Sequence, residues 1–498
     1  MNFELLTDLF QPDLILFCFL GTLFGVIMGA IPGLNGAVGV SLLLPLTYNM
    51  SVQAGLLMLG GIYMGGMYGG SITAILINVP GDVVATCTAM EGYPMTQQGR
   101  SREALYYSVF ASSFGGLIGI AALIFFTPPL ANIALKFGPP EMMLVAICGL
   151  AVVGSLSGNH LWKSLLAVCL GLFIPTIGLD QMTTIARMTF GIRTLNSGFS
   201  TIPICLGFFC FAEMFRNIGQ KKAEQFVYQD TPIRRITVIK EILRKPILLL
   251  RSALIGIFVG ILPGVGGTMA VFLSYGEAKR TSKHPELFGK GSTEGIVAAE
   301  SANNALVGGA LVPMLALGIP GSPTSAILAC ALTMHGIICG PDLFVKRPEV
   351  AYTFLYGMLF TILAMALLGA LGIRYFAYIL KIKMQYIIPA VMVFALFGAY
   401  SINNRMLDVF TAVGFGILGV LLSRFEIPIP PVIIGVVLSP LIEQNLRRAL
   451  QMAKAAEIPF PLYVIQRPLS LVLLVIVVFF FVLFFGMRAK NDKTPKAD

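Results

Sequence analysis

Charged side chains are scarce in this sequence. Only 12% of its 498 residues are Asp, Glu, Lys or Arg, whereas a soluble domain has about 25%. The stretch from Leu14 to Gly81 contains none of them. This composition excludes a soluble catalytic domain. Since about 20 apolar residues suffice for one crossing of a bilayer, the sequence predicts a polytopic membrane protein.

Residue types that build metal and acid–base sites are also few or poorly spaced. The three histidines, His160, His284 and His335, lie far apart and belong to no HExxH or paired-carboxylate pattern. No two cysteines form a CxxC pair, and their apolar surroundings are typical of small buried side chains. The sequence therefore predicts no enzyme activity, no cofactor and no metal beyond a transient sodium site.

The N-terminus lacks the basic residues of a signal peptide. It reads MNFELLTDLFQPD and is acidic, so the first apolar segment is expected to remain as a membrane helix. The net charge of +10 comes from Lys and Arg in short loops between apolar segments. Such a distribution indicates orientation in a lipid bilayer, and it does not predict a nucleic-acid partner.

What the sequence does contain is a repeated glycine–proline motif. GVIMGAIPGLNG at Gly25–Gly36 returns as GIFVGILPGVGG at Gly256–Gly267, a shift of 231 residues. Proline removes a backbone donor and glycine relaxes the restriction on φ, so each copy predicts a helix that breaks partway through the bilayer. For the glycines spaced four apart, close packing of membrane helices is an equally good explanation.

The repeat continues beyond this motif. Pro80-Gly81 recurs as Pro320-Gly321 at a shift of 240, and Gly154–Asn159 resembles Gly398–Asn403 at a shift of 244. Three matches in the same order favour a duplication. The predicted organisation is a first transmembrane repeat (1–215), a basic cytoplasmic connector (216–250), a second transmembrane repeat (251–460), and a C-terminal transmembrane helix with a basic tail (461–498).

Loop charges indicate that the two halves have opposite orientations. The loop Thr47–Ala54 has no charge. Its counterpart has four basic residues against two acidic ones: Lys279, Arg280, Lys283 and Lys290 against Glu277 and Glu286. Short cytoplasmic loops are enriched in Lys and Arg. The predicted fold is therefore an all-α polytopic membrane protein with two inverted-topology repeats, broken or re-entrant helices and a C-terminal helix. The basic residues after the apolar segment predicted near 428–442, Arg447 among them, do not fit this orientation.

Small polar side chains gather beside the predicted breaks. Hydroxyl, amide and freed carbonyl oxygens can coordinate a cation there, and the N-terminus of a half-helix presents N–H groups to an anion. Hydrogen bonds to neighbouring helices are an alternative explanation. Asp82 and Glu300 are the ionisable residues closest to the breaks. The predicted substrate- and ion-binding residues are Gly33, Asn35, Ser71, Thr73, Asn78, Pro80, Gly81, Gly264, Glu300, Ser301, Asn303, Asn304, Pro320, Gly321, Ser322 and Thr324.

Asn303 and Asn304 are adjacent amides that should point to different faces of one helix. We expect them to enclose one anion and its coupling cation, together with the segments Asn78–Asp82 and Gly318–Ser325 facing each other. From Ser301 to Pro341 the sequence has no charged residue. Helix N-termini and bound cations would therefore have to stabilise the anion without a buried Lys or Arg.

Three long strings surround these residues: GAIPGLNGAVGVSLLLPLT; GGIYMGGMYGGSITAILINVPGD followed by EGYPMTQQGR; and HPELFGKGSTEGIVAAESANNALVGGALVPMLALGIPGS. In them the sequence resembles the large membrane subunit of the bacterial tripartite tricarboxylate transporter family, and the resemblance covers nearly the whole chain before residue 461. It implies a multi-pass secondary transporter of the inner membrane. Its implied partners are a small membrane subunit and a periplasmic solute-binding protein, and a homo-oligomer is an open possibility.

The resemblance implies import of citrate-like or other carboxylates, driven by a sodium or proton gradient. It does not fix the solute, because the family has members for varied organic acids. A channel, or a carrier for a solute that is not a carboxylate, is the alternative. Channels also have broken helices, but they do not need duplicated halves around a closed site.

Overall fold

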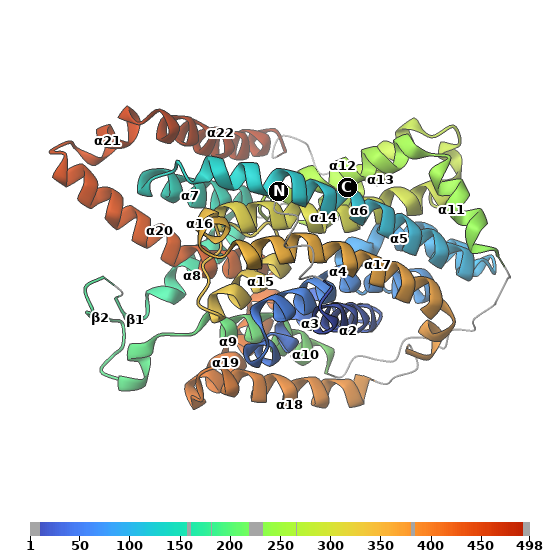
Figure 1. Cartoon of the computed structure of the whole chain (residues 1–498), viewed down its shortest axis with the longest axis horizontal. Helices are drawn as coiled ribbons and strands as arrows, with labels where there is room; N and C mark the ends of the chain where they lie inside the picture. The colour runs from blue at the N-terminus through green and yellow to red at the C-terminus, as the bar shows by residue number, and fades with distance from the viewer. Residues whose placement is uncertain are drawn as a thin grey trace.

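The computed structural model describes residues 10–156, 161–180, 182–218, 233–264, 266–379 and 384–491, and these residues are almost entirely helical (Figure 1). Parts of the N-terminus, the predicted connector, the third repeat match and the basic tail lie outside the described residues. The long helices are α2 (Pro12–Gly29), α3 (Gly36–Leu43), α4 (Val52–Ile77), α5 (Thr86–Gln97), α6 (Ser101–Ala134), α7 (Pro139–Leu156), α8 (Leu161–Phe173), α11 (Arg235–Leu243), α12 (Pro246–Ile261), α13 (Gly267–Thr281), α14 (Thr293–Leu317), α15 (Pro323–Met334), α17 (Pro348–Ile379), α18 (Met384–Asn403), α19 (Met406–Arg424), α20 (Ile429–Ala455) and α22 (Pro468–Asn491).

Shorter elements connect these helices. One two-stranded antiparallel hairpin pairs β1 with β2, with Gly178 opposite Arg187, and in Figure 1 it lies at the edge of the molecule. The short elements are η1 (Pro45–Asn49), η2 (Val83–Ala85), η3 (Ile174–Thr176), β1 (Gly178–Leu179), β2 (Ala186–Arg187), η4 (Arg193–Ser197), α9 (Thr201–Cys205), the π-helical η5 (Leu206–Phe211), α10 (Ala212–Asn217), η6 (Pro285–Leu287), α16 (Pro341–Lys346) and α21 (Phe460–Gln466).

Both copies of the glycine–proline motif separate two helices, as predicted. The segment between α2 and α3 turns at Gly33, whose φ is 80°, and the segment between α12 and α13 turns at Gly264, whose φ is 73°. Side chains strongly disfavour such positive values. The prolines one position earlier, Pro32 and Pro263, have no N–H to continue the helix. The predicted helix breaks are confirmed.

The other glycines of the motif bring helices into backbone contact. A Cβ at Gly25 would lie 2.4 Å from the carbonyl oxygen of Ile62 in α4. A Cβ at Gly256 would lie 2.3 Å from the carbonyl oxygen of Ala302 in α14. The next glycine, four residues later, makes the same kind of contact in each half. Close packing therefore explains these glycines, and α2 packs on α4 as α12 packs on α14.

The Pro-Gly segments fold back onto the long helices in the same way in both halves. The N–H of Gly81 donates to the carbonyl of Gly70 at 3.1 Å, and the N–H of Gly321 donates to the carbonyl of Ala310 at 3.3 Å. Donors and acceptors are each 240 residues apart (321 − 81 and 310 − 70). The same local fold therefore occurs twice at the predicted spacing.

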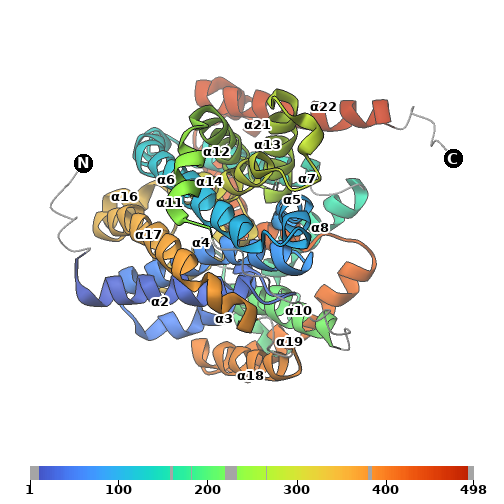
Figure 2. The same cartoon turned by 90° about the vertical axis from the view of Figure 1, so that its right-hand side faces the viewer.

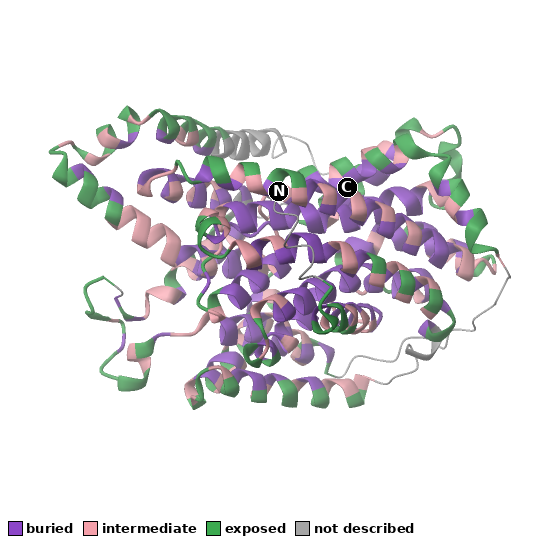
Figure 3. Ribbon diagram, in the orientation of Figure 1, coloured by how far each residue is buried: buried purple, intermediate pink, exposed green. Residues whose placement is uncertain are grey.

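The α4 and α14 helices form the centre of the molecule. Nearly all their residues are buried (Figure 3), and α6 and α17 pack beside them. In both views α18 and α22 lie at opposite edges with this centre between them (Figures 1 and 2). The polar residues of the predicted site that lie on α4 and α14 are therefore held inside the helical bundle.

The structure confirms an all-α polytopic membrane protein. Among the described residues, six helices are long and apolar enough to cross a membrane, namely α2, α6, α17, α18, α19 and α20. The α21 helix and the segment Pro468–Phe479, bent by 103°, form a seventh candidate.

Three features were not predicted. The hairpin of β1 and β2 follows an apolar segment, α11 forms inside the predicted connector, and α20 continues to Ala455, well past residue 442. The strands of the hairpin are short, and the two helical segments have faces that are half polar. Hydropathy alone therefore gives no signal for these three features.

Candidate functional site

We call the segments Asn78–Asp82 and Gly318–Ser322 tip 1 and tip 2. Each follows a long buried helix that ends in a left-handed residue, with φ of 55° at Asn78 and 75° at Gly318. Pro80-Gly81 and Pro320-Gly321 form the bends. Glycine and asparagine tolerate this conformation best, which is why the helices end at these residues.

Tyr63 of α4 lies close to tip 2. Its hydroxyl is 2.8 Å from the hydroxyl of Ser322. Tyr63 is itself buried. It was not among the predicted site residues, because a tyrosine in a glycine-rich apolar helix carries no signal of its distant contacts.

Side chains of this chain cap the helix starts near the breaks. Asn35 caps α3 by accepting the N–H of Val38 at 3.0 Å. Ser322 and Ser325 form a capping box on α15, with N–H···O distances of 3.1 and 2.9 Å, and Thr324 is buried between them. Asp82 caps η2 in the same manner. Only the N–H groups that remain uncapped in these first turns could bind an anion.

The glycines of the two breaks contact different parts of the chain. The carbonyl of Gly33 accepts a hydrogen bond from the side chain of Asn217 at 3.3 Å. The N–H of Gly264 donates to the carbonyl of Gly321 at 3.4 Å. The second break is therefore bonded directly to tip 2, whereas the first is bonded to α10.

Glu300 is fully buried where α14 meets three helices of the first half. Ser71 of α4 and Ser112 of α6 each donate to its carboxylate at 2.6 Å, and Thr88 of α5 donates to it as well. The structure thus brings together Ser71 and Glu300, two predicted residues that are 229 positions apart. Three hydroxyls stabilise a carboxylate that no cationic side chain approaches among the described contacts.

The two adjacent asparagines both contact α4. The amide nitrogen of Asn303 donates to the carbonyl of Met67 at 3.2 Å, and that of Asn304 lies 3.1 Å from the sulfur of Met365 in α17 and 3.6 Å from that of Met64. Among the described residues, neither side-chain carbonyl oxygen has a hydrogen-bond partner. A buried acceptor without a partner costs about 1 to 3 kcal/mol, so a bound ligand or water would be stabilised here.

Replacing Asn303 or Asn304 by alanine should weaken solute uptake about tenfold or more, because a buried amide that can bind the solute or its cation is lost. Uptake by purified variants in proteoliposomes measures this, with insertion checked by chromatography. Ser401→Ala is the control, since the Ser401 residue is exposed and, within the described ranges, its hydroxyl donates only to the carbonyl of Phe397 in its own helix. Unchanged uptake and unchanged solute dependence in both asparagine variants would place the site elsewhere.

Two other predicted residues make ordinary helix contacts. The hydroxyl of Thr73 donates to the carbonyl of Gly70 in its own helix at 3.2 Å. That of Ser301 lies 3.4 Å from the carbonyl of Ala111 in α6. The alternative explanation, hydrogen bonding within and between helices, accounts for both.

The predicted residues thus occupy two places. One is the α4–α14 centre, with Ser71, Thr73, Glu300, Ser301, Asn303 and Asn304. The other is the breaks and tips, with Gly33, Asn35, Asn78, Pro80, Gly81, Gly264, Pro320, Gly321, Ser322 and Thr324. The residues that sequence reasoning missed are Tyr63, Thr88 and Ser112, whose partners are 188 or more residues away.

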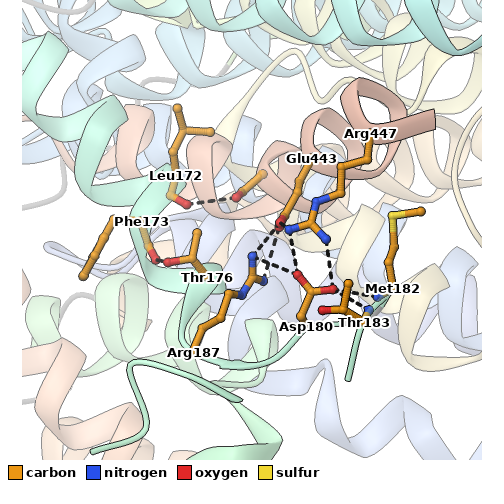
Figure 4. Close-up of polar contacts among 10 residues, drawn as sticks. Leu172, Phe173, Thr176, Asp180, Met182, Thr183, Arg187, Glu443 and Arg447 are labelled. Carbon is orange, nitrogen blue, oxygen red and sulfur yellow. Dashed lines mark hydrogen bonds and ion pairs between the residues drawn. The ribbon is translucent and has the colours of Figure 1, made fainter. Parts of the chain in front are cut away.

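A second polar cluster lies between the hairpin and α20 (Figure 4). Asp180 is buried, and Arg447 binds its two oxygens at 3.0 and 2.7 Å. Arg187 contacts both Asp180, at 3.2 Å, and Glu443, at 2.5 Å. The cluster lines a small pocket of about 50 Å³. Arg447, which did not fit the predicted orientation, is therefore part of an ion-pair network.

The pKa of Asp180 lies well below its usual value. The main cause is the N–H of Thr183, which donates to the carboxylate, followed by the hydrogen bond from Arg447. This contact stabilises the folded protein at every pH above the ordinary pKa of Asp. The stabilisation is lost as the pH falls through the lowered pKa of Asp180 in the folded state. The hairpin should therefore stay anchored at neutral pH.

No group of three or more His, Cys, Asp and Glu side chains suited to a metal ion occurs in the part of the chain that the structure describes. Between α4 and α14, the described buried polar groups are hydroxyls, amides and the carboxylate of Glu300. Together with the candidate spans, they define the class: a polytopic α-helical membrane protein with a polar interior between two similarly folded helix pairs.

The chain belongs to the tripartite tricarboxylate transporter TctA family. The profile of that family, described as "Tripartite tricarboxylate transporter TctA family", matches residues 15–434. The chain is also similar to two proteins of Agrobacterium vitis. It is 37% identical over 490 residues to the "Uncharacterized 52.8 kDa protein in TAR-I ttuC' 3'region", covering 97% of this chain and 95% of the relative.

The second relative is the "Uncharacterized protein in TAR-II ttuC' 3'region", which is 38% identical over 195 residues, covering 39% of this chain and 81% of the relative. No solved structure gives a significant match. Family membership makes the chain a subunit of a transporter, and the tripartite system implies partner subunits and a binding protein.

Proposed function

We propose that this chain is the translocating subunit of a secondary active transporter in the bacterial inner membrane. It imports a carboxylate, a citrate-like tricarboxylate or a related organic acid, delivered by a periplasmic binding protein and driven by a sodium or proton gradient. The observation that carries the proposal is the pair of similarly folded breaks and tips around the buried α4–α14 centre in a member of this family. Transporter sites commonly lie between such broken helices.

The order of contacts between α4 and α14 supports oppositely oriented halves. Met64, Met67 and Ser71 of α4 contact Asn304, Asn303 and Glu300 of α14 respectively. Positions rise along one helix while they fall along the other, so the two helices run in opposite directions. Since α4 and α14 are counterparts in the repeat, this is the arrangement expected of inverted repeats.

The two halves also differ in packing: equivalent helices are covered by other helices in one half and are exposed in the other. Such a difference supports a protein with more than one conformation. Helix α3 packs against η5 and α18, whereas an open apolar groove of about 980 Å³ runs between α12 and α13. Counterparts 231 residues apart are buried in α3 and exposed in α13: Val38, Ser41 and Leu42 against Met269, Phe272 and Leu273. Alternating access interchanges such unequal packing between repeats.

Reconstitution tests the proposal. This chain, the small membrane subunit and the binding protein in proteoliposomes should accumulate a carboxylate from a panel of citrate, tartrate, malate and succinate. Without the binding protein, uptake at low solute concentration should fall about tenfold or more, because the binding protein supplies the captured anion.

Collapse of the ion gradients should abolish accumulation but leave equilibration. Uptake at full rate without the binding protein would contradict delivery by that protein. Electrical currents far above carrier turnover would instead favour a channel, and uptake of only uncharged solutes would exclude the carboxylate class.

A further inference from the structure

Glu300 differs from the other buried acidic residues in its hydrogen-bond donors. Five Asp and Glu side chains are buried among the described residues. Four of them accept hydrogen bonds from backbone N–H, amide or guanidinium groups: Glu91 from Gly289, Gly291 and Ser292; Glu141 from Arg467 and Gly138; Asp180 from Arg447, Met182 and Thr183; Asp408 from Arg405 and Asn403. In the described part of the chain, the hydrogen bonds to Glu300 come from hydroxyls alone.

This difference decides which charge states each site can hold. N–H and guanidinium groups only donate, so they stabilise the carboxylate and cannot accept a hydrogen bond from the acid. A hydroxyl both donates and accepts. The hydroxyls of Ser71, Thr88 and Ser112 can therefore bind Glu300 as an anion, and after one of them rotates they can bind it as a neutral acid.

Burial without a cation makes the neutral state accessible. A carboxylate deep in a membrane protein is expensive unless it is paired. Among the described residues, the hydrogen-bond donors to Glu300 are uncharged hydroxyls, so no fixed positive charge holds it as an anion.

The charged groups on the elements packed around α14 either contact other partners or, like Lys279 of α13, are exposed. None of the described Lys or Arg side chains on these elements contacts Glu300. The basic and acidic side chains near α14 instead make these contacts: Glu91 with the Gly289–Ser292 backbone, Glu103 with Arg100, Arg102 over the ring of Tyr106, Arg251 and Arg280 with Glu277, Lys245 with Glu294, Asp342 with Lys346, and Asp82 with the N–H of Val84.

We infer that Glu300 binds and releases the coupling proton of the transport cycle. A proton from the outer solution joins the carboxylate to give the neutral acid, and the same proton leaves to the inner solution after the conformational change. The neutral acid lowers the cost of holding charge inside the bundle while the site moves between faces. This inference rests on the proposed function and assigns its coupling ion.

Glu300→Gln tests the assignment, because the amide has the shape of the neutral acid and cannot release a proton. In proteoliposomes with the complete transporter, accumulation driven by a pH gradient should fall about tenfold or more. Exchange of solute at equal concentrations should fall by less, because exchange does not require release of the proton. Glu286→Gln is the control, since the Glu286 side chain is 62% exposed. Its accumulation should match the wild type.

Accumulation by Glu300→Gln at the wild-type rate would overturn the assignment. So would wild-type accumulation driven by a sodium gradient with no pH gradient. Ser112→Ala gives a second variant: it removes a donor to the carboxylate, so the pH midpoint of uptake should rise. An unchanged midpoint would count against Glu300.

Infrared difference spectroscopy of the purified chain keeps the test independent of the solute. Acidification between about pH 9 and pH 5 should produce a buried carboxylic-acid band that is missing in Glu300→Gln. The lack of any such band in the wild type would refute the assignment. Its presence in a wild type that transports no carboxylate would refute the proposed function instead.

Discussion

Replacing Gly29 or Gly260 by valine is expected to abolish the folded protein. A Cβ at Gly29 would lie 2.4 Å from the carbonyl oxygen of Gly66, and one at Gly260 would lie 2.6 Å from that of Leu306. Both neighbours are backbone atoms inside the most buried helices, so no side chain can rotate away. The helix pairs would have to separate along their length.

Overpacking at one core position commonly costs about 1 to 3 kcal/mol, and contact with backbone is at the upper end or beyond it. We expect the yield of monodisperse protein on size-exclusion chromatography to fall about tenfold or more, with equal effects in the two halves. Gly414→Val in α19 is the matched control, because a Cβ there meets no atom within 4 Å. Wild-type yield and uptake in Gly29→Val would mean that α2 and α4 do not pack as described.

The helix breaks were predictable because their causes are local. Proline lacks an N–H, and glycine accepts positive φ at any position. Pro32-Gly33 and Pro263-Gly264 therefore predict a helix break even when the helices that pack against them are unknown. The repeat then predicted that both halves share the feature. The same reasoning could not decide between breaking and packing for Gly25 and its counterpart, because that depends on which helix lies opposite.

The surroundings of Glu300 were not predictable. Ser71, Thr88 and Ser112 lie 188 to 229 positions from it in the sequence, and each is a common residue of a membrane helix. Only the packing of α4, α5 and α6 around α14 makes them one group. The sequence identified Glu300 only as one of the ionisable residues closest to the breaks, and the structure places it within the continuous helix α14.

The hairpin illustrates a different limit. Its strands are two residues long, which is too short for an alternating pattern, and it depends on Asp180 meeting Arg447 from a helix 267 positions later. Arg447 lies inside α20, and its partner Asp180 is far away in the sequence. The orientation rule counts charges without knowing their partners, so it could not account for this residue.

Opposite orientation of the halves is expected to give an all-or-none labelling result. Ser51 precedes α4 and His284 precedes α14, and both are exposed, His284 with 69% of its side chain. If the halves are inverted, the uncharged loop at Ser51 faces the periplasm and the basic loop at His284 faces the cytoplasm. Neither substitution removes a Lys or Arg that sets orientation.

The central claim is that the two copies have opposite orientations in the membrane, and accessibility of Ser51→Cys and His284→Cys to a membrane-impermeant maleimide tests it most directly. A Cys169→Ser background removes the exposed native thiol. In intact cells whose outer membrane is permeable, Ser51→Cys should label fully, and His284→Cys should label only after the inner membrane is opened. Labelling of both cysteines from the same side would contradict the inverted arrangement.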